Sequence, residues 1–353
     1  MSKPRVLVTF DAMRYPNTGL FSFGKSFGRA LLRNNNCQFE LDYFFYSPDT
    51  IEFDTEDVHK TYLQKHNKFF FFNKNNVALF HFTDQMSRLK PKKVFGRKKI
   101  LTIHDINQVH EVTNPDQLRI YLDKLGERID SCDRIVTISQ FAAADVLNYF
   151  PKVADKLSVI YNGADKPHLP NGHLPSYIPE REFLFTIGIV SAKKNFHVLP
   201  ALLADNDLEL LIAGIKTPYE NQVMAEAAKY GCTDRVKVIG TISDDDRAWY
   251  YQNCQAFVFP SIAEGFGLPV IEAMHFGKPV FSSTRTSLPE VAGNAAYYFK
   301  TFDGADMQRV FKEGMQHFNA NNGAERSVAH AAKYNWDDTA RLYMQLYRDV
   351  LQK

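Results

Sequence analysis

Short runs of apolar residues alternate along the first half of the chain with longer segments of mixed polarity. The runs have the length and continuous apolar character of buried parallel strands. They lie at residues 5–10, 78–82, 99–103, 134–138 and 157–160. Between the first two runs, the segment 21–33 places Phe23, Phe27, Ala30 and Leu31 on one helical face. After the run 134–138, Ser139 suits the N-cap of a helix that ends near Tyr149. This alternation predicts a parallel α/β sheet.

The same pattern starts again after a segment rich in proline, glycine and asparagine, from Tyr161 to about Pro179. Further strands are predicted at residues 183–187, 208–212, 236–239, 256–259 and 279–281. We therefore expect two doubly wound domains, at residues 1–170 and 171–335. Residues 336–353 are predicted to form an amphipathic helix whose apolar positions are Ala340, Leu342, Tyr343, Leu346, Tyr347 and Leu351. Because ligands bind beyond the carboxyl ends of such strands, we expect a ligand cleft between the domains.

A glycine loop follows the strand 256–259. Glu264 and Glu272 stand eight residues apart, with Gly265 and Gly267 between them, while Pro269 suits the start of a helix and Gly277 its end. Backbone N–H groups of such a loop and the helix dipole favour a phosphate. Carboxylates accept hydrogen bonds from sugar hydroxyls, so a sugar nucleotide fits the loop, with Glu272 placed in the first helical turn. The alternative is a plain turn with two solvated glutamates.

Three other predicted strand ends carry residues with suitable chemistry. Lys193 and Lys194 follow the strand 183–187, where they would neutralise a diphosphate. His104 ends the strand 99–103, where it would contact a ligand. Gly19 precedes the first helix and would let the backbone approach a ligand. The alternatives are solvated lysines, a structural histidine and a simple turn.

No metal ion or cofactor is expected. Cys37, Cys132, Cys232 and Cys254 have neither ligand spacing nor close pairing, which favours free thiols in a cytosolic protein. The run from Ser243 to Asp246 is compatible with a divalent-metal site, but we interpret it as an N-cap followed by acids in the first helical turn.

The net charge is only +2, but basic residues crowd into one stretch. They are Arg88, Lys90, Lys92, Lys93, Arg97, Lys98 and Lys99. Four phenylalanines at 69–72 lie just upstream, so the stretch from Lys68 to Lys99 suits an anionic membrane surface. The alternative is a solvated loop beside a buried phenylalanine strand. No nucleic-acid motif, signal peptide or membrane span is apparent, so we expect a cytoplasmic protein, peripheral at the inner face of the membrane.

These residues together resemble the retaining glycosyltransferases of family 4, which have the GT-B fold. The Glu264–Glu272 spacing matches the family's Glu-x7-Glu motif, and Lys193-Lys194-Asn195 resembles its Arg-Lys-Asn segment. Looser N-terminal matches are Gly19 and residues 102–105, 133–139 and 159–163, and residues 287–293 and the final helix from Trp336 complete the set. Many members carry arginine where this chain has Ile189, and the family's double glycine is reduced to Thr18-Gly19.

The resemblance implies a role for each matching residue. Glu272 would hold the ribose, Glu264 the donor sugar hydroxyls, Lys194 the leaving diphosphate with Lys193 nearby, and His104 the donor sugar from the opposite domain. Backbone N–H groups would bind sugar and phosphate, supplied by Gly265, Phe266, Gly267 and Leu268. The final helix would cross back onto the first domain.

The implied activity is metal-independent transfer of a hexose, with mannose as first choice, from a nucleotide diphosphate sugar. The acceptor would be a glycan or a lipid-linked molecule in surface polysaccharide or lipopolysaccharide synthesis. The alternatives are a sugar-nucleotide epimerase with the GT-B fold and a non-catalytic sugar-nucleotide-binding protein. The sequence leaves the donor base, the acceptor and the oligomeric state open.

Overall fold

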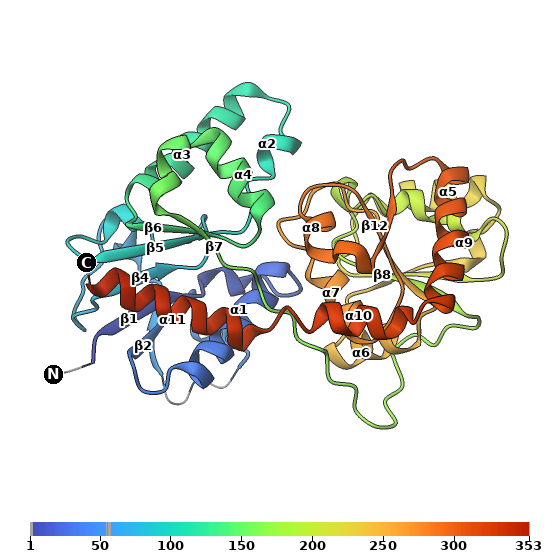
Figure 1. Ribbon diagram of the computed structural model, residues 1–353. Coiled ribbons are helices and arrows are strands. Elements are labelled where there is room, and N and C mark those ends of the chain that lie inside the picture. Colours follow the sequence, from blue (N-terminus) through green and yellow to red (C-terminus); the bar gives the residue numbers. More distant parts are fainter. Residues whose placement is uncertain (1–2, 54, 56–57, 353) are drawn as a thin grey trace. The chain divides into compact units, whose positions relative to one another are not determined.

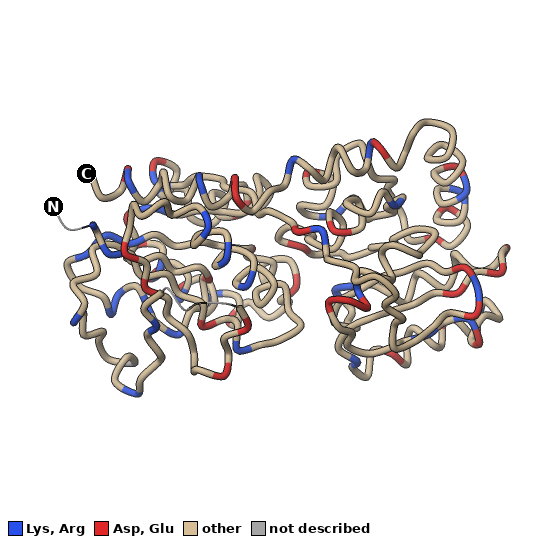
Figure 2. Tube along the Cα trace, turned by 90° about the horizontal axis from the view of Figure 1, so that it is seen from below, with Lys and Arg blue, Asp and Glu red and all other residues tan. Residues whose placement is uncertain are grey.

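A computed structural model describes residues 3–53, 55 and 58–352 of the chain (Figure 1). Contacts between residues divide it into two compact units. Unit 1 comprises Met1–Gly163 together with Asn335–Lys353, and unit 2 comprises Ala164–Tyr334. Lys, Arg, Asp and Glu are distributed along both units (Figure 2). Each unit is described below by itself.

The described residues of unit 1 form a seven-stranded parallel sheet in the order β3-β2-β1-β4-β5-β6-β7. The strands are β1 (Arg5–Thr9), β2 (Glu40–Phe45), β3 (His59–Tyr62), β4 (Leu79–Phe82), β5 (Lys98–Ile103), β6 (Arg134–Thr137) and β7 (Leu157–Val159). The α-helices are α1 (Gly19–Asn34), α2 (Gln108–Glu111), α3 (Pro115–Asp130), α4 (Gln140–Tyr149) and α11 (Trp336–Gln352). Short 3-10 helices are η1 (Asp11–Arg14), η2 (Pro48–Thr50), η3 (Lys65–Lys68), η4 (Pro91–Lys93) and η5 (Pro151–Lys156).

The five strands predicted for this unit are confirmed within two residues at either end, but β2 and β3 were missed. β3 is an edge strand of four residues that are all partly or fully exposed, so its sequence carries no alternation of apolar and polar positions. The predicted face of α1 is confirmed, since Phe23, Phe27 and Ala30 are all buried. Ser139 caps α4 as predicted, because its side chain accepts a hydrogen bond from the amide of Ala142.

The C-terminal helix α11 packs against α1 within unit 1 (Figure 1). Its buried face holds Trp336, Thr339, Ala340, Tyr343, Met344, Tyr347 and Val350. Leu342, which we predicted on this face, is instead 54% exposed, because it lies a quarter-turn from Tyr343. Leu346 and Leu351 are only partly buried at its margin. The helix is amphipathic as predicted, but its buried stripe is centred on the tyrosines rather than on the leucines.

A buried histidine joins α11 to the sheet. Nδ1 of His81, on β4, lies 2.6 Å from the hydroxyl of Tyr347, and Nε2 lies 2.8 Å from Oγ1 of Thr102 on β5. The same threonine oxygen lies 2.9 Å from the hydroxyl of Tyr343. Burial lowers the pKa of His81 to about 3, so the imidazole is neutral at physiological pH and both ring nitrogens are engaged.

Unit 2 contains a six-stranded parallel sheet in the order β10-β9-β8-β11-β12-β13. The strands are β8 (Phe183–Ile187), β9 (Glu209–Ala213), β10 (Val236–Gly240), β11 (Ala256–Phe259), β12 (Val280–Ser283) and β13 (Tyr297–Phe299). The α-helices are α5 (Glu220–Lys229), α6 (Asp244–Asn253), α7 (Leu268–His275), α8 (Leu288–Ala292), α9 (Gly304–Ala320) and α10 (Gly323–Ala331). The 3-10 helices are η6 (Ala192–Lys194), η7 (Phe196–Leu203), η8 (Thr233–Arg235) and η9 (Gly293–Ala295).

All five strands predicted for unit 2 are confirmed within two residues, and only the three-residue edge strand β13 was missed. Two parallel sheets of this kind, each built from strands alternating with helices, make up the doubly wound architecture that the sequence predicted. Among the described residues, no helix is both long enough and apolar enough to cross a membrane.

We expect acid to weaken unit 1 through His81. The unfolded chain binds a proton near pH 6.5, whereas the folded state resists protonation down to about pH 3, so stability present above pH 6.5 is lost as the pH falls. Between pH 7 and pH 5 this single group removes about 2 kcal/mol from the free energy of unfolding. His81→Gln keeps a donor and an acceptor but cannot titrate, so its loss over that range should be smaller by this amount.

Urea unfolding at both pH values measures the difference. Trp336 fluorescence in a Trp249→Phe background reports unit 1, because these are the two tryptophans of the chain and only Trp336 belongs to that unit. An equal loss of stability in wild type and His81→Gln would contradict the assignment.

Candidate active site

The predicted order of strand, glycine loop and helix is confirmed in unit 2. β11 ends at Phe259, and α7 begins at Leu268 with Pro269 in its first turn. Gly267 is the N-cap, with φ of 97°, and a Cβ there would come within 2.6 Å of the Leu288 side chain. Both the conformation and the space therefore require glycine at this position. Gly277, with φ of 66°, follows the helix as predicted.

One detail of the prediction is wrong, because Glu272 lies in the second turn of α7 rather than in its first. The helix starts at Leu268, one residue before the predicted Pro269, so Glu272 is its fifth residue and falls just beyond the first turn. It is 8% exposed and its carboxylate accepts a hydrogen bond of 3.0 Å from the hydroxyl of Tyr251. Arg247 lies 3.8 Å from the other carboxylate oxygen. The charge of Glu272 is the main cause that raises the pKa of Arg247.

Sequence reasoning missed Arg247 and Tyr251. Both lie on α6, four residues apart, and therefore on one face of that helix. Their spacing is a usable signal, but only once α6 is known to pack beside α7. The Nε atom of Arg247 is buried and has no hydrogen-bond partner within the described residues, so this guanidinium keeps a donor available next to Glu272.

Lys194 and Glu264 form a direct ion pair. The Nζ atom of Lys194 donates to Oε1 of Glu264, and both side chains are largely buried. The ammonium also lies 4.9 Å from the centre of the Phe259 ring. The backbone amide of Glu264 donates to Oγ1 of Thr286, at 3.0 Å, which ties the glycine loop to the segment after β12. The structure thus brings together two predicted site residues that are 70 positions apart.

Lys193 contributes its backbone to the same region. Its carbonyl accepts hydrogen bonds from the amide of Ile262, at 2.9 Å, and from the hydroxyl of Ser261, at 3.2 Å. The residue is half-buried. These backbone contacts join η6 to the start of the glycine loop, so the position of Lys194 relative to Glu264 is fixed from both sides.

The remaining predicted donor residues lie in or beside the glycine loop. Gly265 and Gly267 are buried, and Leu268 is the first residue of α7. The Phe266 side chain is 3% exposed and meets the Tyr334 ring edge-on, with 5.5 Å between ring centres. Phe266 therefore anchors the loop through its side chain.

His104 and Gly19 belong to unit 1. His104 follows β5 and is 7% exposed, with its Nε2 atom 2.7 Å from the carbonyl oxygen of Thr83. Burial lowers its pKa, so the neutral imidazole donates its Nε2 proton to Thr83 and leaves Nδ1 as an acceptor. Gly19 is the first residue of α1, and a Cβ there would meet nothing within 4 Å. There is therefore open space at the start of the helix, and neither a close contact nor the backbone conformation requires glycine at this position.

Other polar atoms at this edge of unit 1 were missed by the sequence analysis. Asn107, which is 2% exposed, has neither side-chain nitrogen nor oxygen hydrogen-bonded within the described residues. The hydroxyl of Thr137, at the end of β6, and the side-chain oxygen of Asn162, after β7, are likewise buried and unpaired there. Since buried polar atoms are normally satisfied, these groups are suited to a polar ligand.

The acidic run at Ser243 caps a helix, as we interpreted it. The Ser243 side chain accepts from the amide of Asp246, and Asp246 itself accepts from Nε2 of His173, at 2.7 Å, and from Oγ of Ser176, at 2.8 Å. Within the described ranges, no three His, Cys, Asp or Glu side chains are placed to hold a metal ion.

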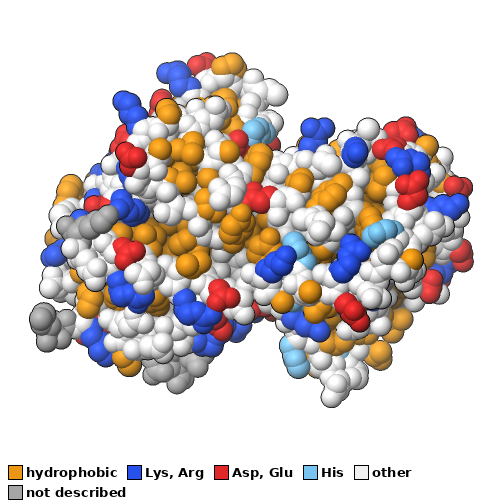
Figure 3. Space-filling model, in the orientation of Figure 1, with side chains coloured by type: hydrophobic (Ala, Val, Ile, Leu, Met, Phe, Trp, Pro, Cys, Tyr) orange, Lys and Arg blue, Asp and Glu red, His pale blue; other side chains and the backbone are white. Residues whose placement is uncertain are grey.

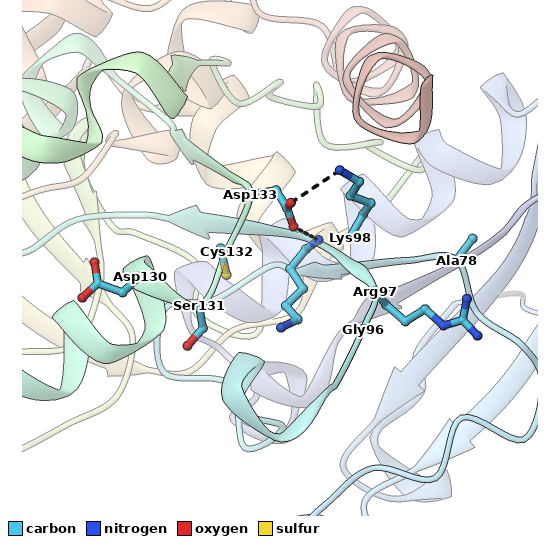
Figure 4. A pocket seen from close by; sticks show the side chains of 9 residues that line it. Ala78, Gly96, Arg97, Lys98, Asp130, Ser131, Cys132 and Asp133 are labelled. Atoms are coloured by element: carbon cyan, nitrogen blue, oxygen red, sulfur yellow. Dashed lines mark hydrogen bonds and ion pairs between the residues drawn. The ribbon is translucent and has the colours of Figure 1, made fainter. Parts of the chain in front are cut away.

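A pocket of about 560 Å³ lies elsewhere, at the starts of β5 and β6 (Figure 4). Its lining consists of Ala78, Gly96, Arg97, Lys98, Lys99, Asp130, Ser131, Cys132 and Asp133. Lys98 forms an ion pair with Asp133, at 3.7 Å. Because ligands of parallel sheets bind at the opposite, carboxyl edge, we do not assign the donor to this pocket.

The contact between Arg247 and Glu272 yields a test of the geometry. Arg247→Met leaves a nearly buried carboxylate with Tyr251 as its remaining partner, and we expect it to lower the free energy of unfolding by about 1–3 kcal/mol. Glu272→Gln removes the negative charge. It should therefore lower the free energy of unfolding less in the Arg247→Met background than in the wild-type background. Urea unfolding of the four proteins gives a coupling energy, expected to be about 1 kcal/mol or more. A coupling energy of zero would show that the two side chains do not interact.

Two family models match successive parts of the chain. One, described as Glycosyltransferase Family 4, matches residues 70–166, and the other, described as Glycosyl transferases group 1, matches residues 176–316. The serotype-specific mannosyltransferase WbdA of Escherichia coli is 28% identical over 281 residues, which cover 72% of this chain but only 34% of WbdA. The chain thus spans about a third of that relative. The O-antigen chain mannosyltransferase B of Escherichia coli is 26% identical over 71% of this chain and 70% of its own length.

Solved structures share the fold over nearly the whole chain. Sucrose-phosphate synthase from Thermosynechococcus elongatus has a TM-score of 0.78 at 19% identity, covering 99% of this chain and 100% of that one. WaaG, a glycosyltransferase involved in lipopolysaccharide biosynthesis, has a TM-score of 0.69 at 12% identity, with 97% and 99% covered. The predicted GT-B fold is thereby confirmed. With both family models matched in order along two parallel sheets, the chain belongs to the group 1 glycosyltransferases of family 4.

Proposed function

We propose that this protein transfers a hexose, with retention of configuration, from a nucleotide diphosphate sugar to a glycan or lipid-linked acceptor. The observation that carries the proposal is the ion pair of Lys194 with Glu264 beside the start of α7. It places a cation and a hydroxyl-binding carboxylate next to a helix N-terminus, the combination that a sugar diphosphate requires. Mannose is the first choice of sugar, supported by the mannosyltransferase relatives, and synthesis of surface polysaccharide or lipopolysaccharide is the proposed setting.

In this proposal each site residue of unit 2 has a separate role. Glu272, held by Tyr251 and Arg247, accepts hydrogen bonds from the ribose hydroxyls. Glu264 accepts them from the donor sugar. The backbone amides of the glycine loop and the first residue of α7 bind sugar and phosphate, namely those of Gly265, Phe266, Gly267 and Leu268. A bound nucleoside diphosphate has precedent in the fold, since HepE of Anabaena, at a TM-score of 0.75, was solved with UDP and glucose.

The reaction breaks the bond between C1 of the donor sugar and the diphosphate oxygen, so negative charge develops on the diphosphate. Lys194 leaves Glu264 in part to stabilise this charge, with Lys193 nearby, and the preorganised amides of the loop add to it. The leaving phosphate oxygen takes the proton of the acceptor hydroxyl, which attacks from the same face. In this arrangement the leaving group itself acts as the base.

His104 and Gly19 are the proposed contributions of unit 1. The neutral His104 ring keeps an acceptor at Nδ1, which suits a hydroxyl group of the donor sugar. The open space at Gly19 lets a substrate approach the start of α1. Ile189 stands where many family members have arginine. Its side chain, which is 38% exposed, is apolar and therefore supplies no cation to the diphosphate. Lys193 is the cation that takes its place in this proposal.

Two substitutions test the donor site. Glu272→Ala should weaken binding of the nucleoside diphosphate, and Lys194→Ala should lower kcat, each by about ten- to hundredfold, because each removes a charge-assisted contact. The measurement is turnover of a panel of nucleotide sugars, with thermal shifts for binding. Lys229→Ala, an exposed lysine on α5, is the matched control and should behave like wild type. Wild-type kinetics in both site variants would refute the site, and epimerised donor instead of transferred sugar would refute the reaction.

We also propose that an anionic membrane is the surface on which unit 1 works. The structure rules out the buried phenylalanine strand considered above, because residues 69–72 form no strand and Phe69 and Phe72 are 69% and 56% exposed. Only Phe71 packs on the core, and its amide donates to the carbonyl of Lys93, at 3.0 Å. This hydrogen bond places the phenylalanines beside η4 and the 74% exposed Phe95. Figure 3 shows hydrophobic side chains interspersed with Lys and Arg on the surface of this unit.

Part of the basic charge in this stretch is already balanced. Lys92 pairs with Glu127, and Lys98 pairs with Asp133. Lys90 is exposed and Lys93 half-buried beside the phenylalanines, and no ion pair is recorded for either among the described residues. Exposed rings together with unbalanced cations suit the boundary between lipid headgroups and acyl chains. The proposed location is therefore peripheral, at the inner face of the cytoplasmic membrane.

Vesicle binding tests this location. Phe69→Ser with Phe72→Ser and Phe95→Ser should reduce co-sedimentation with vesicles of phosphatidylcholine and phosphatidylglycerol at least about tenfold, and so should Lys90→Glu with Lys93→Glu at low salt. Leu342→Ser on α11 and Lys312→Glu on α9 are matched controls at exposed positions. Equal binding by wild type and both sets of variants would refute membrane association through this surface.

A further inference from the structure

Two tyrosines and two arginines cluster at the carboxyl edge of the unit 1 sheet. Arg14 and Tyr15 follow β1, Tyr46 follows β2, and Arg88 lies in the connection after β4. The sheet order is β2-β1-β4-β5, so these connections are neighbours, and the direction in which strands are added reverses between β1 and β4. Ligands of doubly wound sheets bind at this point of reversal. None of these four residues has a role in the donor site.

The aromatic rings are exposed around a guanidinium group. The Arg14 guanidinium carbon lies 4.3 Å from the centre of the Tyr15 ring and 5.3 Å from that of the Tyr46 ring. The Tyr15 and Tyr46 side chains nevertheless remain 50% and 40% exposed. An exposed ring beside a cation offers an apolar surface to the C–H face of a sugar and a positive charge to an anionic substituent.

Positive charge is concentrated at the Tyr15 hydroxyl. Arg14 donates to this oxygen through Nη2, at 3.0 Å, and this hydrogen bond is the main cause that lowers the pKa of Tyr15. The charge of Arg14 and an interaction with Arg88 lower it further. Two guanidinium groups therefore face one exposed phenol oxygen, and Arg88 is itself exposed.

A buried carboxylate holds this cluster in place. Asp11, which is 1% exposed, accepts hydrogen bonds from the hydroxyl of Ser87, at 2.7 Å, and from the backbone amide of Arg88, at 2.6 Å. The Arg14 guanidinium lies 3.8 Å from the same carboxylate, and the charge of Asp84 also acts on it. Arg128 on α3 donates to the carbonyl of Ser87, at 3.0 Å. The connections after β1 and β4 are thereby fastened together, so the two arginines are positioned before any ligand binds.

We infer that this cluster is an acceptor subsite for a sugar that carries an anionic group, either a phosphate or a carboxylate. The sugar ring packs on Tyr15 and Tyr46, while Arg14 and Arg88 bind the anionic oxygens. This inference rests on the proposed transferase function, since it names the class of acceptor for that reaction. Arginine suits the anion because its planar guanidinium matches the geometry of carboxylate and phosphate oxygens.

Binding of small sugars to the nucleotide-free full chain tests the inference by ligand-observed NMR. The probes are mannose 6-phosphate and glucuronate, compared with mannose, glucose and inorganic phosphate. We expect one of the two anionic sugars to bind about tenfold more tightly than its neutral counterpart, with an affinity that falls as salt is raised. Preference for the phosphate identifies a phosphorylated acceptor, and preference for glucuronate identifies an acidic glycan. Equal affinity for charged and neutral sugars would overturn the inference.

Variants locate the binding. Arg88→Gln should remove the preference for the anionic sugar, and Tyr46→Ala should weaken that sugar without affecting inorganic phosphate. Arg88 contacts Asp11 only through its backbone, so its substitution leaves the buried hydrogen bonds intact. Arg119→Gln, an exposed arginine on α3 of the same unit, is the matched control. Unchanged binding in Arg88→Gln and Tyr46→Ala would place the ligand elsewhere and refute the subsite.

One further variant distinguishes binding at this subsite from binding at the donor site. Lys194→Ala should still bind the anionic sugar, because Lys194 belongs to unit 2, and loss of binding in this variant would refute the assignment to unit 1. A chain that binds no nucleoside diphosphate and transfers no sugar would refute the proposed function. Nucleoside diphosphate binding and sugar transfer are measured separately from the sugar titrations, so failure of the proposed function leaves the result of the titrations unchanged.

Discussion

Parallel pairing of strands is the constraint on which both candidate sites depend. In a parallel sheet every strand ends at the same edge, and a strand's neighbours are set by pairing rather than by sequence distance. β8 pairs with both β9 and β11, so the segment after β8 comes to lie beside the segment after β11. The contact of Lys194 with Glu264 is a direct result of this pairing. In unit 1, β1 pairs with both β2 and β4, which brings Arg14 and Arg88 to one edge by the same principle.

The two sites differ in how far their charged side chains are paired with groups of opposite charge. In unit 2 four charged side chains form two pairs of opposite sign, Lys194–Glu264 and Arg247–Glu272. In unit 1 the Arg14 guanidinium lies near the buried carboxylate of Asp11, whose pKa is raised by burial, whereas Arg88 contacts Asp11 through its backbone amide. A balanced site must exchange an internal partner for its ligand, whereas an unbalanced one attracts an anion without giving up a contact. The paired charges of unit 2 suit a donor whose diphosphate product must be released after each cycle. The arginines of unit 1 suit an acceptor that is recognised by its negative charge.

Much of the fold follows from the sequence because buried parallel strands are continuous apolar runs, and ten of them were located this way. The strands that were missed are β2 and the edge strands β3 and β13, and the edges are short and partly solvated. In the site, Glu264, Lys194 and Glu272 were predicted from strand ends and spacing. Tyr251 and Arg247 were not, because their importance comes from the packing of α6 beside α7. Leu342 was misplaced because helical periodicity identifies a stripe but not which of its margins faces the core.

The packing of α11 has a consequence for the order in which the chain matures during synthesis. Unit 2 is one continuous segment, so it holds all of its own residues when Tyr334 has left the ribosome. Unit 1 is begun first but lacks Tyr343 and Tyr347, the partners of His81 and Thr102, until the last helix emerges. Until then its sheet keeps a polar and aromatic surface uncovered between β4 and β5. Unit 1, which is begun first, is therefore completed only after unit 2, and its folding depends on the synthesis of α11.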